Sequence, residues 1–380
     1  IAEKELLALS KQYRAIAVVG PRQSGKTTLV RRCFPGKAYV NLENTDTRRF
    51  AIEDPRGFLS GFPHGAILDE VQRAPEIFSY LQQVLDENNT KGQFILTGSN
   101  NFLLQQNISQ TLAGRVGYLF LLPLSLQELD HPFPSTDALI YRGFYPEIYA
   151  DKEMDAGKYY SNYIRTYVER DVRMIKNIVD LYTFERFVRL CAGRTGQLLN
   201  MNSLAIEAGV DNKTVASWLS VLETSFIVFR LQPYHKSFNK RIVKMPKLYF
   251  YDTGLASALL GIDNKEQLGL HPSRGALFEN MVVVEFLKNR FNSGKTNNLF
   301  FWRDNVGTEI DLLIENSESL IPVEIKSGQT ITDAYFKSIT TWCKISGIDN
   351  GWVIYAGNQP QKRSKGITVL PYTEIGTFQP

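Results

Sequence analysis

The sequence has few cysteines, no long hydrophobic run and little net charge, and each of these absences excludes a class of protein. Three cysteines occur in 380 residues, far apart at Cys33, Cys191 and Cys343. An odd number at such distances fits neither a disulfide framework nor a zinc cluster, and it predicts a reducing, cytoplasmic location. No apolar run reaches the roughly 18 residues that a membrane-spanning helix needs, so we expect no membrane association.

The net charge is +4, from 43 Lys and Arg against 39 Asp and Glu. This excess is too small to indicate nucleic-acid binding by itself. Its distribution is uneven, because residues 131–252 carry 17 basic and 13 acidic side chains while the two flanking thirds are nearly neutral. A basic surface is therefore expected in the middle of the chain.

The first third of the chain alternates short apolar strands with amphipathic helices. The expected strands lie at residues 15–19, 38–42, 66–68, 93–96 and 117–122. Such alternation predicts a parallel sheet covered by helices on both faces. The chain then reads as helical from about residue 158 to 225, and its last part as helix, strand, hairpin and a further helix-strand pair.

A phosphate-binding signature follows the first expected strand. It matches G-x-x-x-x-G-K-[ST] and precedes a helix-like segment, the context that supports the motif. Its backbone N–H groups are expected to surround the phosphates of ATP, with Lys26 neutralising their charge and the Thr27 hydroxyl binding Mg²⁺. The residues expected to bind ATP are Gly20, Pro21, Arg22, Gln23, Ser24, Gly25, Lys26, Thr27 and Thr28.

Polar side chains end two further strands. Asp69 and Glu70 follow the apolar run at 66–68, where Asp69 is expected to hold Mg²⁺ and Glu70 to polarise the attacking water as general base. Thr97 and Ser99 end the next strand, in a position to sense the γ-phosphate or its water. The alternative for Thr97 and Ser99 is ordinary turn chemistry.

Two acids and a lysine lie on an expected hairpin near the C-terminus. Asp311 and Glu324 are brought close by a turn at residues 315–319, and Lys326 shares a face with Glu324 because strand side chains alternate with period two. Asp311 and Glu324 are expected to bind Mg²⁺, and Lys326 to orient a water or stabilise phosphorane charge. The alternative is ion pairing between Lys326 and neighbouring acids.

The middle of the chain has the spacing of a helix-turn-helix, with Gly209 at the turn and Val215 packing the second helix. Strands after it would form a wing. Five basic side chains in this wing are expected to contact DNA phosphates, namely Lys236, Lys240, Arg241, Lys244 and Lys247. The alternative is a strand edge that lysines keep soluble.

The order of these motifs resembles the prokaryotic AAA+ superfamily ATPases that carry a helical, winged-helix middle and a nuclease-like C-terminal domain. The resemblance rests on Gly20–Thr27, Asp69–Arg73, Leu96–Ser99, Leu112–Arg115, Leu122–Ser125, Tyr163–Asp171, Lys247–Leu255, Gly275–Glu279, Glu309–Asp311 and Glu324–Lys326. It implies that Thr97 or Ser99 is the sensor, that Arg115 is an arginine finger or sensor arginine, and that Glu279 is the first acid of a restriction-endonuclease-like site. Arg115 could equally be a structural ion-pair residue.

These patterns predict an α/β protein of three domains. The expected domains are an AAA+ P-loop ATPase (residues 1–130), a helical and winged-helix domain (138–262), and a PD-(D/E)xK nuclease-like domain (270–380). The predicted function is ATP hydrolysis coupled to a DNA-directed module that cleaves DNA with Mg²⁺. The alternative is a nucleotide-dependent switch or scaffold whose C-terminal domain only binds DNA or a protein. An arginine finger acting in trans would require a homo-oligomer.

Overall fold

The fold is described from a computed structural model for residues 1–99, 104, 108, 110–129, 135–168, 180–235, 242–316, 319–364 and 366–378. Three of the predicted DNA contacts, Lys236, Lys240 and Arg241, lie outside these residues, as does the end of the Tyr163–Asp171 motif. Among the described residues, every helix is too short or too polar to span a bilayer.

The chain forms two compact units. The N-terminal unit contains residues 1–123, 224–226 and 290–296, and the C-terminal unit contains residues 124–223, 227–289 and 297–380. Each unit is described by itself.

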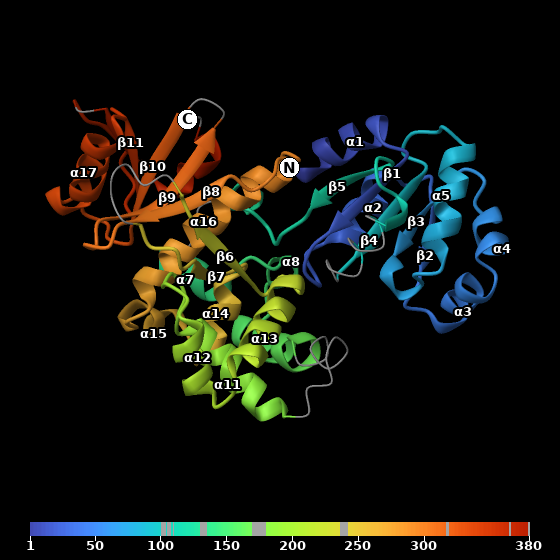
Figure 1. Cartoon of the computed structure of the whole chain (residues 1–380), viewed down its shortest axis with the longest axis horizontal. Helices are drawn as coiled ribbons and strands as arrows, with labels where there is room; N and C mark the ends of the chain where they lie inside the picture. Colours follow the sequence, from blue (N-terminus) through green and yellow to red (C-terminus); the bar gives the residue numbers. More distant parts are fainter. Residues whose placement is uncertain are drawn as a thin grey trace. The chain divides into compact units, whose positions relative to one another are not determined.

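The N-terminal unit is built on a five-stranded parallel sheet (Figure 1). Its strands are β1 (Ala15–Val19), β2 (Ala38–Asn41), β3 (Ala66–Asp69), β4 (Phe94–Gly98) and β5 (Val116–Phe120). Its helices are α1 (Ala2–Gln12), α2 (Lys26–Cys33), α3 (Thr45–Glu53), α4 (Pro55–Ser60) and α5 (Ile77–Glu87). This agrees with the predicted parallel sheet, and strands β1, β3 and β4 are wholly buried, which explains their continuous apolar sequences.

The strand order is β2-β3-β4-β1-β5. Parallel strands place all their carboxyl ends at one edge of the sheet. That edge therefore gathers the P-loop after β1, the acids after β3 and the hydroxyls after β4, a position that doubly wound sheets use for ligands.

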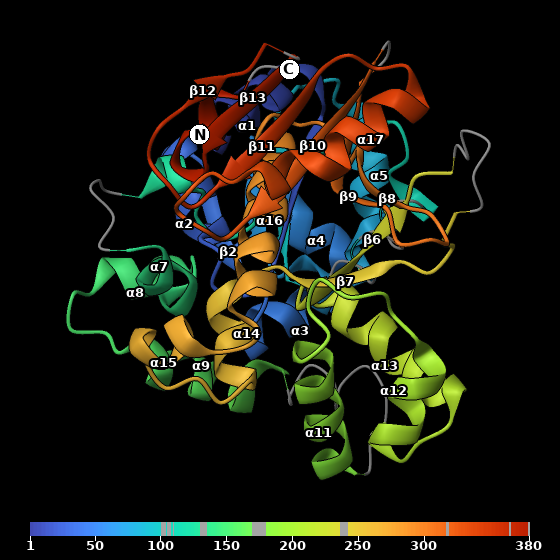
Figure 2. The same cartoon turned by 90° about the vertical axis from the view of Figure 1, so that its left-hand side faces the viewer.

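The C-terminal unit contains helices before, between and after its first strands (Figure 2). These are α7 (Thr136–Arg142), α8 (Pro146–Ala150), α9 (Ala156–Tyr163), α11 (Leu181–Ala192), α12 (Met201–Ala208), α13 (Asn212–Thr224), α14 (Thr253–Leu259), α15 (Lys265–Leu270), α16 (Arg274–Asn292) and α17 (Lys337–Ser346). Helices α12 and α13 are joined at Gly209, which has a left-handed φ of 77° and so permits the tight turn.

Eight strands form the sheet of this unit, in the order β12-β13-β11-β10-β9-β8-β6-β7 (Figure 2). They are β6 (Val228–Pro233), β7 (Lys247–Phe250), β8 (Leu299–Arg303), β9 (Glu309–Asn316), β10 (Ser319–Lys326), β11 (Gly351–Tyr355), β12 (Gln361–Lys362) and β13 (Ile367–Pro371). Trp302 and Trp342 pack edge to face in its core, with ring centroids 4.8 Å apart.

The strands predicted as a wing are therefore part of a larger sheet. Strand β6 pairs antiparallel with β7 and parallel with β8, through Gln232 opposite Phe300. Strands of the predicted middle and C-terminal domains thus lie in one sheet. Both sides of the predicted boundary at residues 262–270 belong to the same compact unit. The winged-helix assignment stays a prediction.

Candidate nucleotide site and C-terminal acid cluster

The P-loop links buried strand β1 to helix α2 through a turn that contains two residues with left-handed backbone conformation. Gly25 has φ 90° and Gln23 has φ 60°, both left-handed. A side chain at Gly20 would bring its Cβ to 2.0 Å from the carbonyl oxygen of Leu121. The backbone is thus held in the curled form that turns N–H groups toward an anion.

Lys26 is buried within this loop. Its side chain is 6% exposed, and its Nζ donates to the carbonyl oxygens of Gly20 at 3.0 Å and Pro21 at 2.6 Å. Burial lowers the pKa of Lys26 to about 8, against the opposing charges of Glu70 and Asp69. A buried ammonium facing loop carbonyls is favourably placed to exchange them for phosphate oxygens, which carry full negative charge.

The Asp69 carboxylate accepts hydrogen bonds from hydroxyl groups on three different elements. Thr27 at the start of α2 donates to Asp69 Oδ2 at 2.9 Å, and Tyr39 of β2 donates to the same oxygen at 2.6 Å. Thr97 at the end of β4 donates to Asp69 Oδ1. A threonine hydroxyl beside a carboxylate is the donor set that Mg²⁺ takes in P-loop sites, so the residues present fit this ion.

Glu70 is aimed by neighbouring polar side chains. It has a left-handed φ of 54°, which turns it away from the strand direction of β3. Its Oε2 accepts from the Ser99 hydroxyl at 2.9 Å and from the Gln72 amide. The structure thus brings Glu70, Thr97 and Ser99 together as the sequence predicts, and their catalytic roles remain predictions.

Arg115 lies at the end of the sheet opposite the P-loop, where the parallel strands begin. It immediately precedes β5, whose first residue pairs with Ala15 at the start of β1, whereas the P-loop follows the end of β1. Its Nε and Nη2 both donate to the Asp86 carboxylate at 2.7 Å. Arg115 is therefore in the ion-pair arrangement in this chain, and a finger role toward the P-loop of the same chain is ruled out by its position.

The C-terminal hairpin brings the predicted acids and lysine together. The β9–β10 register places Leu312 opposite Val323, so Asp311 and Glu324 follow as neighbours across the strands. The Asp311 Oδ2 accepts from the Ile325 amide at 2.8 Å and lies 3.4 Å from Lys326 Nζ, which also contacts Glu324 Oε1 at 2.6 Å. These contacts also fit the predicted alternative, in which Lys326 only forms ion pairs with the two acids.

Glu324 has an oxygen without a partner. Its side chain is buried, and Oε2 has no hydrogen-bond donor. Burial first, and then the charge of Asp311, raise the pKa of Glu324 to about 8. A buried carboxylate oxygen of this kind, beside a second carboxylate, fits a bound cation or proton. No group of three or more His, Cys, Asp and Glu side chains in the described ranges is arranged to hold a metal ion.

The Glu279 carboxylate on α16 contacts the side chains of Lys247 and Tyr249. Lys247 Nζ lies 3.0 Å from Glu279 Oε1 and 2.5 Å from Glu309 Oε1, and the Tyr249 hydroxyl also donates to Glu279. The Lys247 side chain is 3% exposed. The prediction that Lys247 contacts DNA is therefore wrong, because its ammonium is buried between two carboxylates.

Sequence reasoning gave no site role to Tyr39, Gln72, Tyr249 or Glu309, and it gave Lys247 a different one. Lys247 and Tyr249 are two residues apart on β7, so their side chains lie on the same face of the strand, and both contact Glu279. This spacing is the sequence feature that could have indicated a shared site. Lys244 is exposed, as expected for a DNA contact, although nothing else supports that role.

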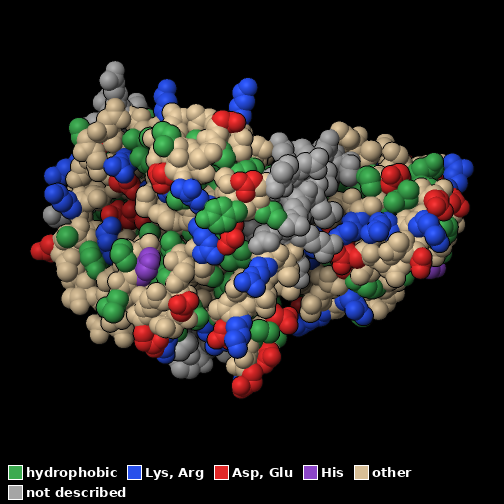
Figure 3. All heavy atoms as spheres, turned by 90° about the horizontal axis from the view of Figure 1, so that it is seen from below, with side chains coloured by type: hydrophobic (Ala, Val, Ile, Leu, Met, Phe, Trp, Pro, Cys, Tyr) green, Lys and Arg blue, Asp and Glu red, His purple; other side chains and the backbone are tan. Residues whose placement is uncertain are grey.

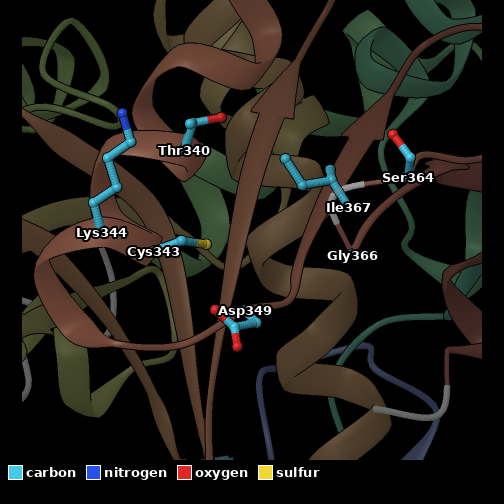
Figure 4. Close-up of a pocket in the computed structure, with 7 residues that line it drawn as sticks. All are labelled: Thr340, Cys343, Lys344, Asp349, Ser364, Gly366 and Ile367. Atoms are coloured by element: carbon cyan, nitrogen blue, oxygen red, sulfur yellow. The ribbon is translucent and has the colours of Figure 1, made fainter.

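A separate hollow of about 460 Å³ lies beside α17. Figure 4 shows Thr340, Cys343 and Lys344 of this helix on one side and Ser364, Gly366 and Ile367 on the other. None of the predicted site residues lines it.

Three families match successive parts of the chain. Residues 12–130 match a family described as an AAA domain. Residues 134–266 and 274–375 match two families described as domains of unknown function, DUF8612 and DUF4143. The N-terminal unit thus contains an ATPase domain of the AAA, P-loop kind.

One bacterial relative and one solved structure are similar to parts of this chain. A protein of Haemophilus influenzae is 23% identical over 61% of this chain and 58% of its own length. In structure, the match to the Walker-type ATPase PABY2304 of Pyrococcus abyssi covers 68% of this chain and 94% of that chain, at 15% identity and a TM-score of 0.48.

Two mycobacterial proteins are more similar. Rv2008c of Mycobacterium tuberculosis and Mb2031c of Mycobacterium bovis, both described as uncharacterized proteins, are each 30% identical to this chain over 366 residues. The alignment covers 95% of this chain and 81% of each relative. This chain therefore belongs to the same family as Rv2008c and Mb2031c, with an AAA domain at residues 12–130.

Proposed function

We propose that the N-terminal unit binds ATP with Mg²⁺ at Gly20–Thr28 and hydrolyses it. The observation that carries this proposal is the convergence of Thr27, Asp69 and Thr97 at the edge of the sheet where Lys26 is buried. Lys26 would neutralise the β- and γ-phosphates, and Glu70, aimed by Ser99, would take a proton from the attacking water. Mg²⁺ held by Thr27 and Asp69 would supply charge neutralisation at the phosphates.

Binding is tested by titration calorimetry with a non-hydrolysable ATP analogue and Mg²⁺. Lys26→Ala removes the buried ammonium and is expected to abolish measurable binding. Lys91→Ala, an exposed lysine of the same unit, serves as the control and is expected to bind like wild type. Unchanged affinity in the Lys26→Ala variant would overturn the site assignment.

We further propose that the acid cluster at Asp311 and Glu324 is a Mg²⁺-dependent nuclease site whose activity depends on the nucleotide state. The unpartnered, buried Glu324 oxygen and the adjacent Lys326 support this reaction class. In such a site the carboxylates hold the cation, and the lysine orients water or stabilises charge on the phosphorane.

A specific observation favours the second candidate, a nucleotide-dependent switch whose C-terminal region only binds a partner. Glu279, the expected first acid, is already neutralised by Lys247, and Lys326 is bonded to both other acids. On the face drawn in Figure 3, the described Lys and Arg side chains lie among Asp and Glu side chains.

Cleavage of plasmid and linear DNA separates the two candidates. The assay uses Mg²⁺ or Mn²⁺ with and without ATP, on wild type and on Asp311→Ala. Cutting by wild type that Asp311→Ala loses supports the nuclease. Cutting that persists in the variant rejects the catalytic assignment, and salt-sensitive binding with no cutting under any condition favours the switch.

A further inference from the structure

A hollow of about 540 Å³ lies on the side of α2 that faces β2 and β3. Its lining includes Thr27 and Thr28 at the start of α2, Arg31 and Arg32 in its last turn, and Lys37 and Tyr39 at β2. The hollow therefore adjoins Thr27, whose hydroxyl is proposed to bind Mg²⁺. A volume of this size suits a small ligand or one nucleotide unit of a larger one.

The charge of the lining is of one sign. Three of its residues are basic and none is acidic. The guanidinium of Arg31 lies 4.8 Å above the Tyr39 ring, and Arg32 Nε is 3.7 Å from Glu3, an exposed pair of little energetic weight. Both guanidinium groups are exposed, and a single guanidinium can bind a phosphate group through two parallel N–H donors.

Lys37 and Tyr39 give the hollow a fixed inner wall. Lys37 Nζ donates to the carbonyl oxygens of Gln93 at 2.9 Å and His64 at 3.4 Å. The Tyr39 hydroxyl donates to Asp69 Oδ2 at 2.6 Å, the same oxygen that accepts from Thr27. Tyr39 thus has its ring under Arg31, at the hollow, and its hydroxyl on the carboxylate of the nucleotide site.

We propose that this hollow binds a phosphate group of an effector distinct from the ATP in the P-loop, and that Tyr39 transmits its occupancy to Asp69. Arg31 would leave the Tyr39 ring to pair with the phosphate, which changes the support of the Asp69 hydrogen bond. The effector is either a nucleic-acid strand, through its phosphodiester backbone, or a free polyphosphate. The regulatory half of this proposal rests on the proposed ATPase function, whereas the binding half does not.

Binding is measured with the P-loop saturated by a non-hydrolysable ATP analogue, so that the probes cannot enter it. The probes are a fluorescent single-stranded oligonucleotide and inorganic tripolyphosphate. The test variant is Arg31→Glu/Arg32→Glu. The matched control is Arg49→Glu/Arg56→Glu, which makes the same charge change at exposed positions of α3 and α4.

We expect at least one probe to bind wild type and the control alike, and to bind the test variant about tenfold or more weakly, with the salt slope reduced by about 1 to 2. Binding of the oligonucleotide alone identifies a nucleic-acid effector, and binding of tripolyphosphate alone identifies a free one. Absence of binding to wild type, or equal loss in both double variants, overturns the proposal.

The transmission is measured as the change in ATP hydrolysis that a saturating bound probe causes. Wild type is expected to respond at least twofold, and Tyr39→Phe to bind the probe but respond less. An equal response in Tyr39→Phe contradicts the relay. If wild type hydrolyses no ATP while the binding pattern holds, the ATPase proposal and the relay fail and the phosphate site stands.

Discussion

The Asp69 carboxylate is the residue on which the nucleotide site depends most. Hydroxyls from Thr27, Tyr39 and Thr97 all donate to it, and together they fix its orientation toward the end of the P-loop. Hydrogen bonds to a charged group contribute about 1.5–3 kcal/mol each, so the loss of one donor should be measurable.

Tyr39→Phe is expected to raise the Mg²⁺ concentration required for half-maximal ATP hydrolysis by several fold, because it removes one donor that orients Asp69. The measurement is the ATPase rate as a function of Mg²⁺ at saturating ATP. Tyr80→Phe, which removes an exposed hydroxyl on α5, is the control. Identical Mg²⁺ curves for wild type and Tyr39→Phe would show that Tyr39 does not position the carboxylate.

Among single residues, the sequence predicts the site residues that lie in motifs. It misses those whose place in the site depends on how the strands pair. Thr27, Asp69 and Thr97 each follow a recognisable strand, so their meeting at one sheet edge could be predicted. Tyr39 precedes Asp69 by 30 residues and reaches it only because β2 pairs with β3 at Asn41 and Asp69. No local pattern encodes that pairing.

At the scale of elements, β7 is the clearest case of a strand whose role the sequence does not reveal. Its lysine belongs to a basic run that is typical of a DNA-binding wing. In the structure Lys247 forms ion pairs with Glu279 and Glu309, which are 32 and 62 residues away in sequence. Whether a lysine is exposed depends on such distant partners, which a charge count cannot supply.

Lys247→Met is expected to lower the free energy of unfolding by about 3–5 kcal/mol, because it leaves two carboxylates around an uncompensated buried position. Lys244→Met, at an exposed position three residues earlier, should change it by less than about 0.5 kcal/mol. Chemical denaturation of both variants measures the difference. Equal stability of the two variants would contradict the burial of Lys247.

Helix α16 carries a second buried pair, Glu285 and Lys288. Lys288 Nζ donates to the Leu124 carbonyl at 2.7 Å, and Glu285 Oε1 accepts from the Leu126 amide at 2.9 Å. Both side chains are essentially inaccessible. Burial raises the pKa of Glu285 and lowers that of Lys288, and the charge of each residue opposes this effect of burial on the other.

Lys288→Met should therefore destabilise the C-terminal unit in a pH-dependent way. Without Lys288 the pKa of Glu285 rises further, so the folded state is favoured by protonation and its stability falls as the pH rises. We expect a larger loss at pH 8 than at pH 5.5, measured by denaturant unfolding. Glu285→Gln/Lys288→Met, which also removes the Glu285 carboxylate, should reduce the pH dependence. A deficit independent of pH in the single variant would refute the explanation.

At the scale of the whole molecule, the three sequence-family matches and the two compact units divide the chain differently. Family matches separate residues 134–266 from 274–375, whereas β6 and β7 of the first range lie in the sheet of the second. The pairing of β6 with β8 joins residues 232 and 300, which no periodicity could predict. The parallel sheet of the N-terminal unit was predictable because its strands are continuous apolar runs close to their motifs.

Coupling between the units is tested by hydrogen exchange with and without the ATP analogue and Mg²⁺. Ligand binding to the native state stabilises the P-loop and β3, by about 2.7 kcal/mol at a concentration of 100 times Kd. If the nucleotide state controls the C-terminal region, exchange in β9 and β10 around Asp311 should change as well. Protection confined to the N-terminal unit would contradict that control and leave ATP binding intact.

The central claim, that this chain hydrolyses ATP at the site formed by the P-loop and the β3 acids, is tested most directly by turnover of Glu70→Gln. The variant keeps the size of Glu70 and removes the base, so we predict unchanged ATP binding and a fall in kcat of about 10²-fold or more. Glu76→Gln, at an exposed position before α5, should hydrolyse ATP like wild type. Hydrolysis by Glu70→Gln at the wild-type rate, or none by wild type itself, would contradict the claim.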